Sequence, residues 1–537
     1  MTAPRNGPIV GERMSGAPIL TLPRNTWRRV HAEQAGIIVD AADYFRAFHA
    51  AAERAQHHIL ISGWQFDRGV QLLRGTDAVG READVELLHF LDRLCTRTPS
   101  LRIYLLAWDF HMVFAFEREW MQRFWFHYAT NERMSFRFEE TESVQGCHHQ
   151  KFAVIDGHTA FVGGIDLCEA RWDDRAHRTV NPLRMSRGEP VKPYHDVQAY
   201  LVGPEPAAAL RDLFVERWAR SGAEPPELGP AAPPGSEPAA PPPPGPGFGS
   251  GSGAIALGPG AIALSRTEPR RKDETIREIE HLLIDALGSA EQLIYIETQY
   301  FSSTRLREAL IERMRAPHRP HLEIVVFVNP RAEKLKEEIA VGLRQAKNLE
   351  ALRGVAAETG NALGIYYSLS DGAGAGQRAT YLHSKLLAVD DRLLTVGSAN
   401  LTNRSMEIDT ELNVAWEAHG GAGDEAAVAT AHARARRIRR LRVSLLAEHG
   451  GFVGLTAVRA LVQPRGLVAR LDALADQPAA RLQRHGPPTV LQETVMMLVD
   501  PEELPFDPDR AEYADGEAAD DEEDLPQGQR AAAERAG

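Results

Sequence analysis

A pattern of three fixed residues, His-x-Lys-x4-Asp, occurs twice in this chain of 537 residues. The fixed residues are His149, Lys151 and Asp156 in the first copy and His383, Lys385 and Asp390 in the second. In both copies six residues separate the aspartate from two small residues, Gly163-Gly164 or Gly397-Ser398. One copy can arise by chance in a long chain, but chance does not explain two copies that are followed by small residues at the same distance. The chain is therefore expected to fold as two similar units.

The apolar residues that follow each lysine predict the local structure. Residues 152–155 and 386–389 are apolar and suited to a β-strand. Side chains two positions apart on a strand point to the same side, so His149 and Lys151 are expected to share one face. The histidine and lysine of the second copy are expected to do the same. His148 would face the opposite side of the strand, and it is left out of the predicted site.

A turn signal ends each motif. Asp156-Gly157 strongly favours a hairpin, and Asp390-Asp391 is expected to act in the same way. Both motif aspartates are therefore expected to serve mainly as turn residues. The returning strand would bring small residues beside the histidine, where a phosphate can approach the backbone. The predicted substrate-binding residues are Gly163, Gly164, Ser398 and Asn400.

The repeated pairing of histidine with lysine points to phosphoryl chemistry. A histidine near neutral pH can act as a nucleophile or as a proton donor. One histidine would attack phosphorus and form a phosphohistidine, while the other protonates the leaving alkoxide and then activates water or an alcohol. Lysines and an amide would stabilise the charge on the phosphoryl oxygens. No metal or other cofactor is expected, because no Cys or His spacing typical of zinc is visible, and chelators are expected not to inhibit.

Strand-like and helix-like patterns alternate along the chain, and a segment rich in Pro, Gly and Ala interrupts them. We predict an α/β fold with a parallel or mixed β-sheet covered by helices in each half. The predicted parts are a flexible N-terminus (1–26), a first repeat (27–221), a linker (222–255), a second repeat (256–449), a helical extension (450–498) and an acidic disordered tail (499–537).

The negative charge is concentrated at one end. The chain carries a net charge of −13, and residues 500–537 hold 14 Asp or Glu against 3 Arg, a net of −11. The other residues therefore carry −13 + 11 = −2, which is unlike the strongly basic surface of a nucleic-acid-binding protein. The basic residues of a helix predicted over 426–448 are interpreted as a solvated face rather than a membrane anchor.

Cysteine content and hydropathy suggest a compartment. The chain has three cysteines, which favours a reducing environment over a disulfide framework. No signal peptide and no apolar run of about 18 residues is visible. A cytoplasmic protein is expected, one that is able to touch the inner membrane face.

Beyond the motifs, several stretches resemble the phospholipase D superfamily. The similarity is greatest to its soluble phosphatidylcholine-hydrolysing branch, in a bacterial form without accessory lipid-binding modules. It covers roughly residues 30–220 and 260–450. The stretches that carry it are residues 161–173 (FVGGIDLCEARWD), Tyr194-His195-Asp196, residues 295–301 (YIETQYF) and residues 403–411 (NRSMEIDTE).

The resemblance implies a fold and a set of roles. The two repeats would form one bilobal sandwich with the active site between them. His149 would be the nucleophile and His383 the general acid and base, with Asp196 and Glu411 orienting the histidines. The residues that would bind phosphate are Lys151, Lys385 and Asn400. The implied reaction cleaves the headgroup phosphodiester of glycerophospholipids to phosphatidic acid and an alcohol, or transfers the phosphatidyl group to another alcohol. A monomer that binds a phospholipid membrane peripherally, and no nucleic acid, is implied as well.

Other readings stay open at this point. A phosphatidyltransferase of the cardiolipin synthase kind would use the same chemistry, and a catalytically idle lipid-binding or scaffold protein would not use it at all. Gly164, Asp166 and Tyr194 differ from the residues usual in the family and leave the headgroup undecided. Gln299 either points into the cleft or packs at the end of its strand.

Overall fold

The computed structural model describes residues 17–81, 85–109, 125–126, 130–141, 146–229, 253–270, 275–331, 341–371, 376–420, 424–452, 455–489, 492 and 507–508. Residues 1–16 of the predicted N-terminus, most of the predicted linker and nearly all of the predicted acidic tail lie outside these ranges. Within the ranges, no helix has both the length and the apolar character that a membrane crossing needs.

The first half of the chain builds an eight-stranded mixed sheet in the order β12-β2-β11-β7-β6-β3-β4-β5. Strands β3, β4 and β5 run parallel, and the other neighbours pair antiparallel. The strands are β2 (Gln34–Val39), β3 (His58–Gly63), β4 (Arg102–Trp108), β5 (Met134–Glu139), β6 (Phe152–Ile155), β7 (Thr159–Gly163), β11 (Val197–Val202) and β12 (Ile255–Ala256).

The second half builds a ten-stranded sheet, to which the first half adds the edge strand β1, in the order β1-β13-β21-β20-β19-β15-β16-β17-β22, with β14 paired to β13. Strands β15, β16 and β17 run parallel. The strands are β1 (Arg28–Ala32), β13 (Gly260–Glu268), β14 (Ile276–Arg277), β15 (Leu293–Thr298), β16 (Glu323–Val328), β17 (Ala362–Ser368), β19 (Leu386–Val389), β20 (Leu393–Gly397), β21 (Glu411–Glu417) and β22 (Leu482–Arg484).

Seven strands of each sheet correspond in order and direction. The run β2-β11-β7-β6-β3-β4-β5 of the first sheet matches the run β13-β21-β20-β19-β15-β16-β17 of the second. The motif hairpins β6–β7 and β19–β20 hold the same place in the two runs. The duplication seen in the motifs therefore extends over both sheets, and the predicted α/β class with a mixed sheet in each half is confirmed.

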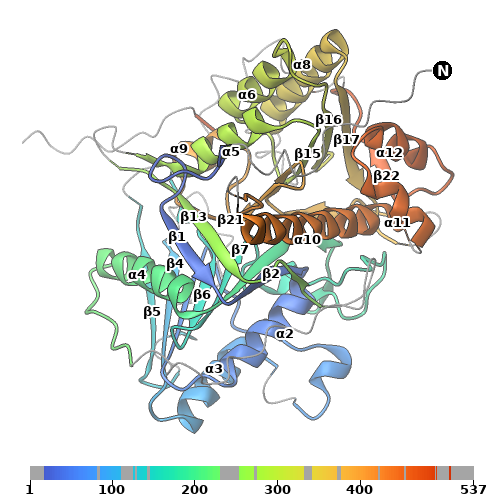
Figure 1. Ribbon diagram of the computed structural model, residues 1–537. Helices are drawn as coiled ribbons and strands as arrows, with labels where there is room; N and C mark the ends of the chain where they lie inside the picture. Colours follow the sequence, from blue (N-terminus) through green and yellow to red (C-terminus); the bar gives the residue numbers. More distant parts are fainter. Residues whose placement is uncertain are drawn as a thin grey trace, which may run out of the picture.

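Helices cover the outer face of each sheet, and the two inner faces meet (Figure 1). Helices α2 and α3 pack on the first sheet, and α5, α6 and α8 pack on the second. Helices α4 and α10 contribute to the core between the sheets. The helices are α2 (Ala41–Ala52), α3 (Leu87–Arg97), α4 (Pro204–Arg220), α5 (Glu278–Ser289), α6 (Thr304–Arg315), α8 (Leu343–Thr359), α9 (Asn403–Glu407), α10 (Glu425–Gly450), α11 (Leu455–Val462) and α12 (Leu467–Ala475).

The two-residue period of a strand explains why both faces of each sheet are apolar. In β3, Leu60 points into the core between the sheets, whereas Ile59 and Ile61 pack under α2 and α3. In β15, Tyr295 points inward, and its neighbours on the strand pack under the helices of the second repeat. Continuous apolar runs are typical of strands that are buried on both faces. This arrangement places the start of each motif strand, next to the motif lysine, where the two repeats meet.

Some basic residues of the arginine-rich helix are buried, although the sequence pattern predicts a solvated face. It is α10, which crosses the middle of the molecule (Figure 1). Arg442 is buried and donates to both oxygens of Asp391, with Nε–Oδ1 at 2.7 Å and Nη2–Oδ2 at 3.1 Å. Arg434 is also buried and donates to main-chain carbonyls. The interpretation is wrong for these two residues because α10 contacts protein on several sides, while Arg436 and Arg440 remain exposed.

Candidate active site

Main-chain hydrogen bonds join the repeats beside both motifs. The short strands β10 (Tyr194–His195) and β18 (Tyr381–Leu382) pair in parallel, and His383 N donates to His195 O at 2.8 Å. The equivalent bond runs from His149 N to Thr410 O at 3.0 Å. The main-chain N–H of each motif histidine thus donates to the carbonyl oxygen of a residue in the other repeat. That residue directly precedes Asp196 or Glu411. The two repeats exchange these contacts in the same way, which brings their motifs together.

His149 is hydrogen-bonded to Glu411, the acid that the family resemblance assigns to it. Its Nδ1 lies 3.1 and 3.0 Å from the two oxygens of Glu411. Ser405 Oγ and Ser398 Oγ also donate to this carboxylate, at 2.7 and 2.5 Å. Burial acts to raise the pKa of Glu411, but His149 and the two hydroxyls outweigh it and lower the pKa. An ionised carboxylate only accepts, so Nδ1 carries a proton, and in the neutral imidazole the lone pair is then on Nε2.

His383 is hydrogen-bonded to Asp196, again the assigned acid, with Nδ1 and Oδ2 2.7 Å apart. The pKa of His383 is held well below its usual value, first by burial and then by the charges of Lys385, Arg171 and Lys151. The charge of His149 acts in the same direction. Both histidines and both lysines are therefore close enough to interact electrostatically. The His149 side chain is 16% exposed and that of His383 is 6% exposed, so His149 is the more accessible of the two.

The two motif lysines point back along their own segments. Lys151 Nζ donates to His149 O at 3.0 Å and lies 3.5 Å from Asp166 Oδ2. Lys385 Nζ donates to His383 O at 2.5 Å and to Gln299 Oε1 at 3.2 Å. Burial is the main cause that lowers the pKa of Lys385 to about 7. A buried ammonium beside His383 favours an anion at this site.

Two amide side chains complete the polar lining. Gln299 points into the site, because its Oε1 accepts from Lys385 and its Nε2 donates to the Tyr381 hydroxyl at 2.8 Å. Asn400 Nδ2 donates to the same Gln299 oxygen at 3.4 Å. Asn400 therefore lies beside the second lysine, as expected for a phosphate-binding residue. Of the two positions left open for Gln299, the one in the cleft is the observed one.

The motif aspartates lie away from the histidines. Asp156 accepts hydrogen bonds from the backbone N–H groups of Gln56, His57 and His58, at 2.7 to 2.9 Å. Asp390 accepts three equivalent bonds from residues 291–293. Each aspartate thus anchors its hairpin to the start of the neighbouring antiparallel strand, β3 or β15. This geometry supports the role in the turn that is expected of both aspartates.

The small residues after each motif pack closely against neighbouring side chains. A Cβ on Gly163 would lie 2.5 Å from Gln198 Oε1, and a Cβ on Gly164 would lie 2.5 Å from Asp196 Oδ1. The Ser398 side chain is buried and donates to Glu411. Gly163 makes room for Gln198, Gly164 makes room for Asp196, and Ser398 holds Glu411. Substrate binding by these three residues stays a prediction.

Sequence reasoning missed several residues around the histidines. Asp166 pairs with Lys151, and Asp166 Oδ1 accepts from the backbone N–H of Trp64 at 2.9 Å. The Tyr194 ring lies 5.4 Å from the His383 ring, and the Arg171 guanidinium lies 5.3 Å from the Tyr194 ring. Asp166 and Arg171 both lie in the stretch after the first motif, so their spacing from it was the one available signal.

Comparisons with known proteins agree with this geometry. A family model described as "Cardiolipin synthase, PLD-like domain" matches residues 283–433. Phospholipase D alpha 1 of Zea mays is 23% identical over 520 residues, which cover 75% of this chain and 63% of that protein. Phospholipase D A of Dictyostelium discoideum is 25% identical over 441 residues, which cover 70% of this chain and 32% of that protein. The chain thus spans less than two thirds of the length of these curated relatives.

Among solved structures, the phosphatidylserine synthase of Haemophilus influenzae Rd KW20 aligns with a TM-score of 0.47 and 14% identity, over 83% of this chain and 94% of that one. The family model and the curated relatives confirm the resemblance stated from the motifs. The chain is similar in sequence to members of the phospholipase D superfamily.

Proposed function

We propose that the protein is a phospholipase D-type phosphodiesterase that cleaves the headgroup phosphodiester of glycerophospholipids. The products would be phosphatidic acid and the headgroup alcohol. One observation carries the proposal. Two histidines, one from each repeat, lie in one site, and each has its Nδ1 on a buried carboxylate of the other repeat. This arrangement leaves an Nε2 atom on each histidine for the reaction.

In the first step, His149 Nε2 attacks phosphorus and the bond from phosphorus to the headgroup oxygen breaks. A P–N bond forms, and His383 donates the proton that the leaving alkoxide needs. Burial first, and then nearby cations, lower the pKa of His383. An anionic phosphodiester bound between these cations would act to raise the pKa of His383 and favour its protonated form.

In the second step, His383 takes a proton from water, and the oxygen attacks phosphorus and breaks the P–N bond. Phosphatidic acid leaves and His149 regains its lone pair. Lys151, Lys385 and Asn400 would hold the phosphoryl oxygens through both steps. An alcohol in place of water would give a new phosphodiester instead. Because the substrate is a lipid, we propose that the enzyme acts while bound peripherally at a membrane surface.

Incubation with mixed phospholipid vesicles and a little ethanol, followed by lipid analysis, tests the proposal. We expect phosphatidic acid together with phosphatidylethanol, because a phosphatidyl-enzyme partitions between water and the added alcohol. The lipid that is consumed identifies the headgroup. The His149→Asn variant is the control for contaminating activity. Unchanged lipids with the folded wild-type enzyme would contradict the proposal.

A phosphatidyltransferase is the second candidate, and the description of the matching family model favours it. Such an enzyme would use the same phosphohistidine but hand the phosphatidyl group to a lipid alcohol. Vesicles that contain phosphatidylglycerol separate the two candidates. Cardiolipin formed faster than phosphatidic acid would favour the transferase, and phosphatidic acid as the main product would favour the hydrolase.

A further inference from the structure

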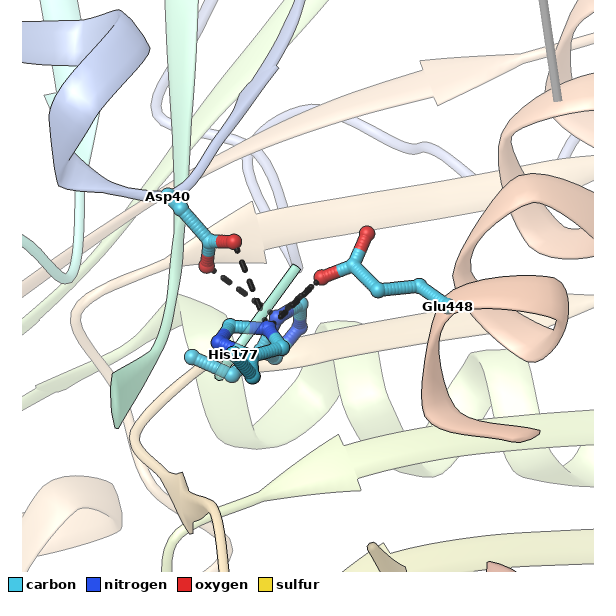
Figure 2. A group of neighbouring side chains, drawn as sticks. Asp40, His177 and Glu448 are labelled. Atoms are coloured by element: carbon cyan, nitrogen blue, oxygen red, sulfur yellow. Dashed lines mark hydrogen bonds and ion pairs between the residues drawn. The ribbon is translucent and has the colours of Figure 1, made fainter. Parts of the chain in front are cut away.

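A second group of buried ionisable residues lies behind the catalytic histidines. Asp40, His177 and Glu448 converge on one point (Figure 2), and His195 joins them. Asp40 follows β2, His177 follows the first motif, His195 lies in β10, and Glu448 comes from the end of α10. All four side chains are at most 3% exposed. Charged groups this deeply buried need partners or a bound ion.

The distances fit the first shell of one small cation. Glu448 Oε1 lies 3.0 Å from His177 Nε2 and 2.9 Å from His195 Nδ1. Asp40 Oδ2 lies 3.4 Å from His177 Nε2, and Asp40 Oδ1 lies 3.2 Å from His195 Nδ1. Ligand atoms about 2.0 Å from a tetrahedral zinc ion are separated by roughly 3.3 Å. Two imidazoles and two carboxylates are also a ligand set that zinc accepts, and the carboxylates balance its charge.

The outer contacts orient each group toward the same point. His177 uses its other nitrogen, Nδ1, on Asp173 Oδ2 at 3.0 Å. His195 uses Nε2 on Glu297 Oε2 at 3.2 Å. A metal-bound histidine characteristically gives its second ring nitrogen to a carboxylate in this way. The second oxygen of Glu448 accepts from Arg175 at 2.5 Å, which leaves Oε1 for the centre of the cluster.

One buried oxygen supports a missing cation independently. Among the described residues, no donor makes a hydrogen bond to Asp40 Oδ2, although Asp40 is 1% exposed. A buried carboxylate oxygen without a donor is costly, and a metal ion would remove that cost. Asp40 and His177 also adopt positive φ angles of 66° and 45°, which non-glycine residues rarely do.

Glu297 is an outer partner and not a ligand. Its oxygens already accept from Ser384 Oγ at 2.6 Å, His449 Nε2 at 3.0 Å and Tyr295 OH at 2.5 Å, besides His195. The set of Asp40, His177, His195 and Glu448 is therefore the more complete site. Its residues are scattered along the chain, which is why no local spacing in the sequence marks it.

We propose that Asp40, His177, His195 and Glu448 bind one divalent transition-metal ion, most readily zinc, as a structural site. The ion would join the first repeat to α10 directly beneath the active site. His195 O accepts from His383 N, and the next residue, Asp196, holds His383 Nδ1. The ion would take no part in the phosphoryl steps, and it would fix the main chain that positions His383. The proposal is independent of which phosphodiester is cleaved.

Metal analysis of the full chain, expressed in zinc-supplemented medium and dialysed, tests the proposal. We expect about one zinc per chain, with a shell of nitrogen and oxygen near 2.0 Å and no sulfur at about 2.3 Å by X-ray absorption. In His177→Ala and Glu448→Gln the zinc content should fall at least about tenfold. His89→Ala, at an exposed histidine, is the matched control and should keep its zinc.

The wild-type protein decides the question even if the variants do not fold. Below about 0.1 zinc per chain, both as purified and after incubation with zinc, and with no change in unfolding temperature on adding zinc, the cluster is an ion-pair network of imidazolium and carboxylate and the proposal is overturned. A sulfur shell, or full zinc content in a folded His177→Ala protein, overturns it as well. Neither the zinc content nor the unfolding temperature depends on enzymatic activity.

Discussion

His149 and His383 occupy equivalent positions but differ in surroundings. Each has its Nδ1 on a carboxylate, which fixes the ring and the tautomer. His149 is the more exposed of the two, which suits a nucleophile that must reach phosphorus. His383 is deeper and lies among cations that lower its pKa. The same motif can therefore supply two different chemical roles.

Replacing either histidine should abolish turnover. We expect His149→Asn and His383→Asn each to lower kcat by at least about 10³-fold, because each removes a group that the other cannot replace. Steady-state phospholipid cleavage measures this, with His89→Asn as the surface control. Near-normal activity in either variant would rule out a shared site.

The pH dependence of substrate affinity should follow Lys385. Its pKa is lowered to about 7, mainly by burial, so the ammonium loses its proton as the pH rises through 7. Binding of an anionic phosphodiester weakens when that charge is lost, and KM should rise above about pH 7. Lys385→Arg keeps the charge and should remove this rise, even if it lowers kcat. A wild-type KM that stays constant from about pH 6 to about pH 9 would contradict the assignment.

At the scale of single elements, the motif hairpin is anchored to a neighbouring strand and also supports the segment that carries the histidine. Its turn aspartate accepts hydrogen bonds from three backbone N–H groups at the start of the adjacent antiparallel strand in both repeats. The strand of each hairpin begins directly after the motif lysine, so the anchored hairpin fixes the segment that carries the histidine. The four residues between the lysine and the aspartate of each motif are therefore this strand.

Loss of that anchor should affect stability and spare the chemistry. Asp156→Asn and Asp390→Asn each remove part of the acceptor set, and each should lower the free energy of unfolding by about 1–3 kcal/mol. Urea unfolding measures the loss. Asp77→Asn, which breaks an exposed pair with Arg46, is the control and should change stability by less than about 1 kcal/mol. A large drop in kcat of the folded Asp156→Asn enzyme, without loss of stability, would show that the aspartate acts in catalysis.

At the scale of the whole molecule, the active site exists only where the two repeats meet. Glu411 of the second repeat holds His149 of the first, and Asp196 of the first holds His383 of the second. The seven corresponding strands of each sheet explain how one motif can occupy two equivalent positions. Neither repeat contains a complete histidine–carboxylate pair for its own motif.

Some of this could be predicted from the sequence, because it depends on local pattern. The motif strands, the hairpin turns and the α/β class follow from short-range spacing of apolar and turn residues. The roles of Gly164 and Ser398 could not be predicted, since they depend on Asp196 and Glu411 lying against them. Buried Arg442 was misjudged for a similar reason, because its partner Asp391 is distant in the chain.

The central claim is that His149 carries the phosphatidyl group during turnover, and trapping that intermediate tests it most directly. The wild-type enzyme is mixed with the lipid identified in the vesicle assay and denatured at mildly alkaline pH, because the P–N bond is labile in acid. Intact-mass and peptide analysis should find a phosphatidyl adduct on His149 that is absent from His149→Asn. Continued turnover with no adduct, or an adduct on a different residue, would contradict the account.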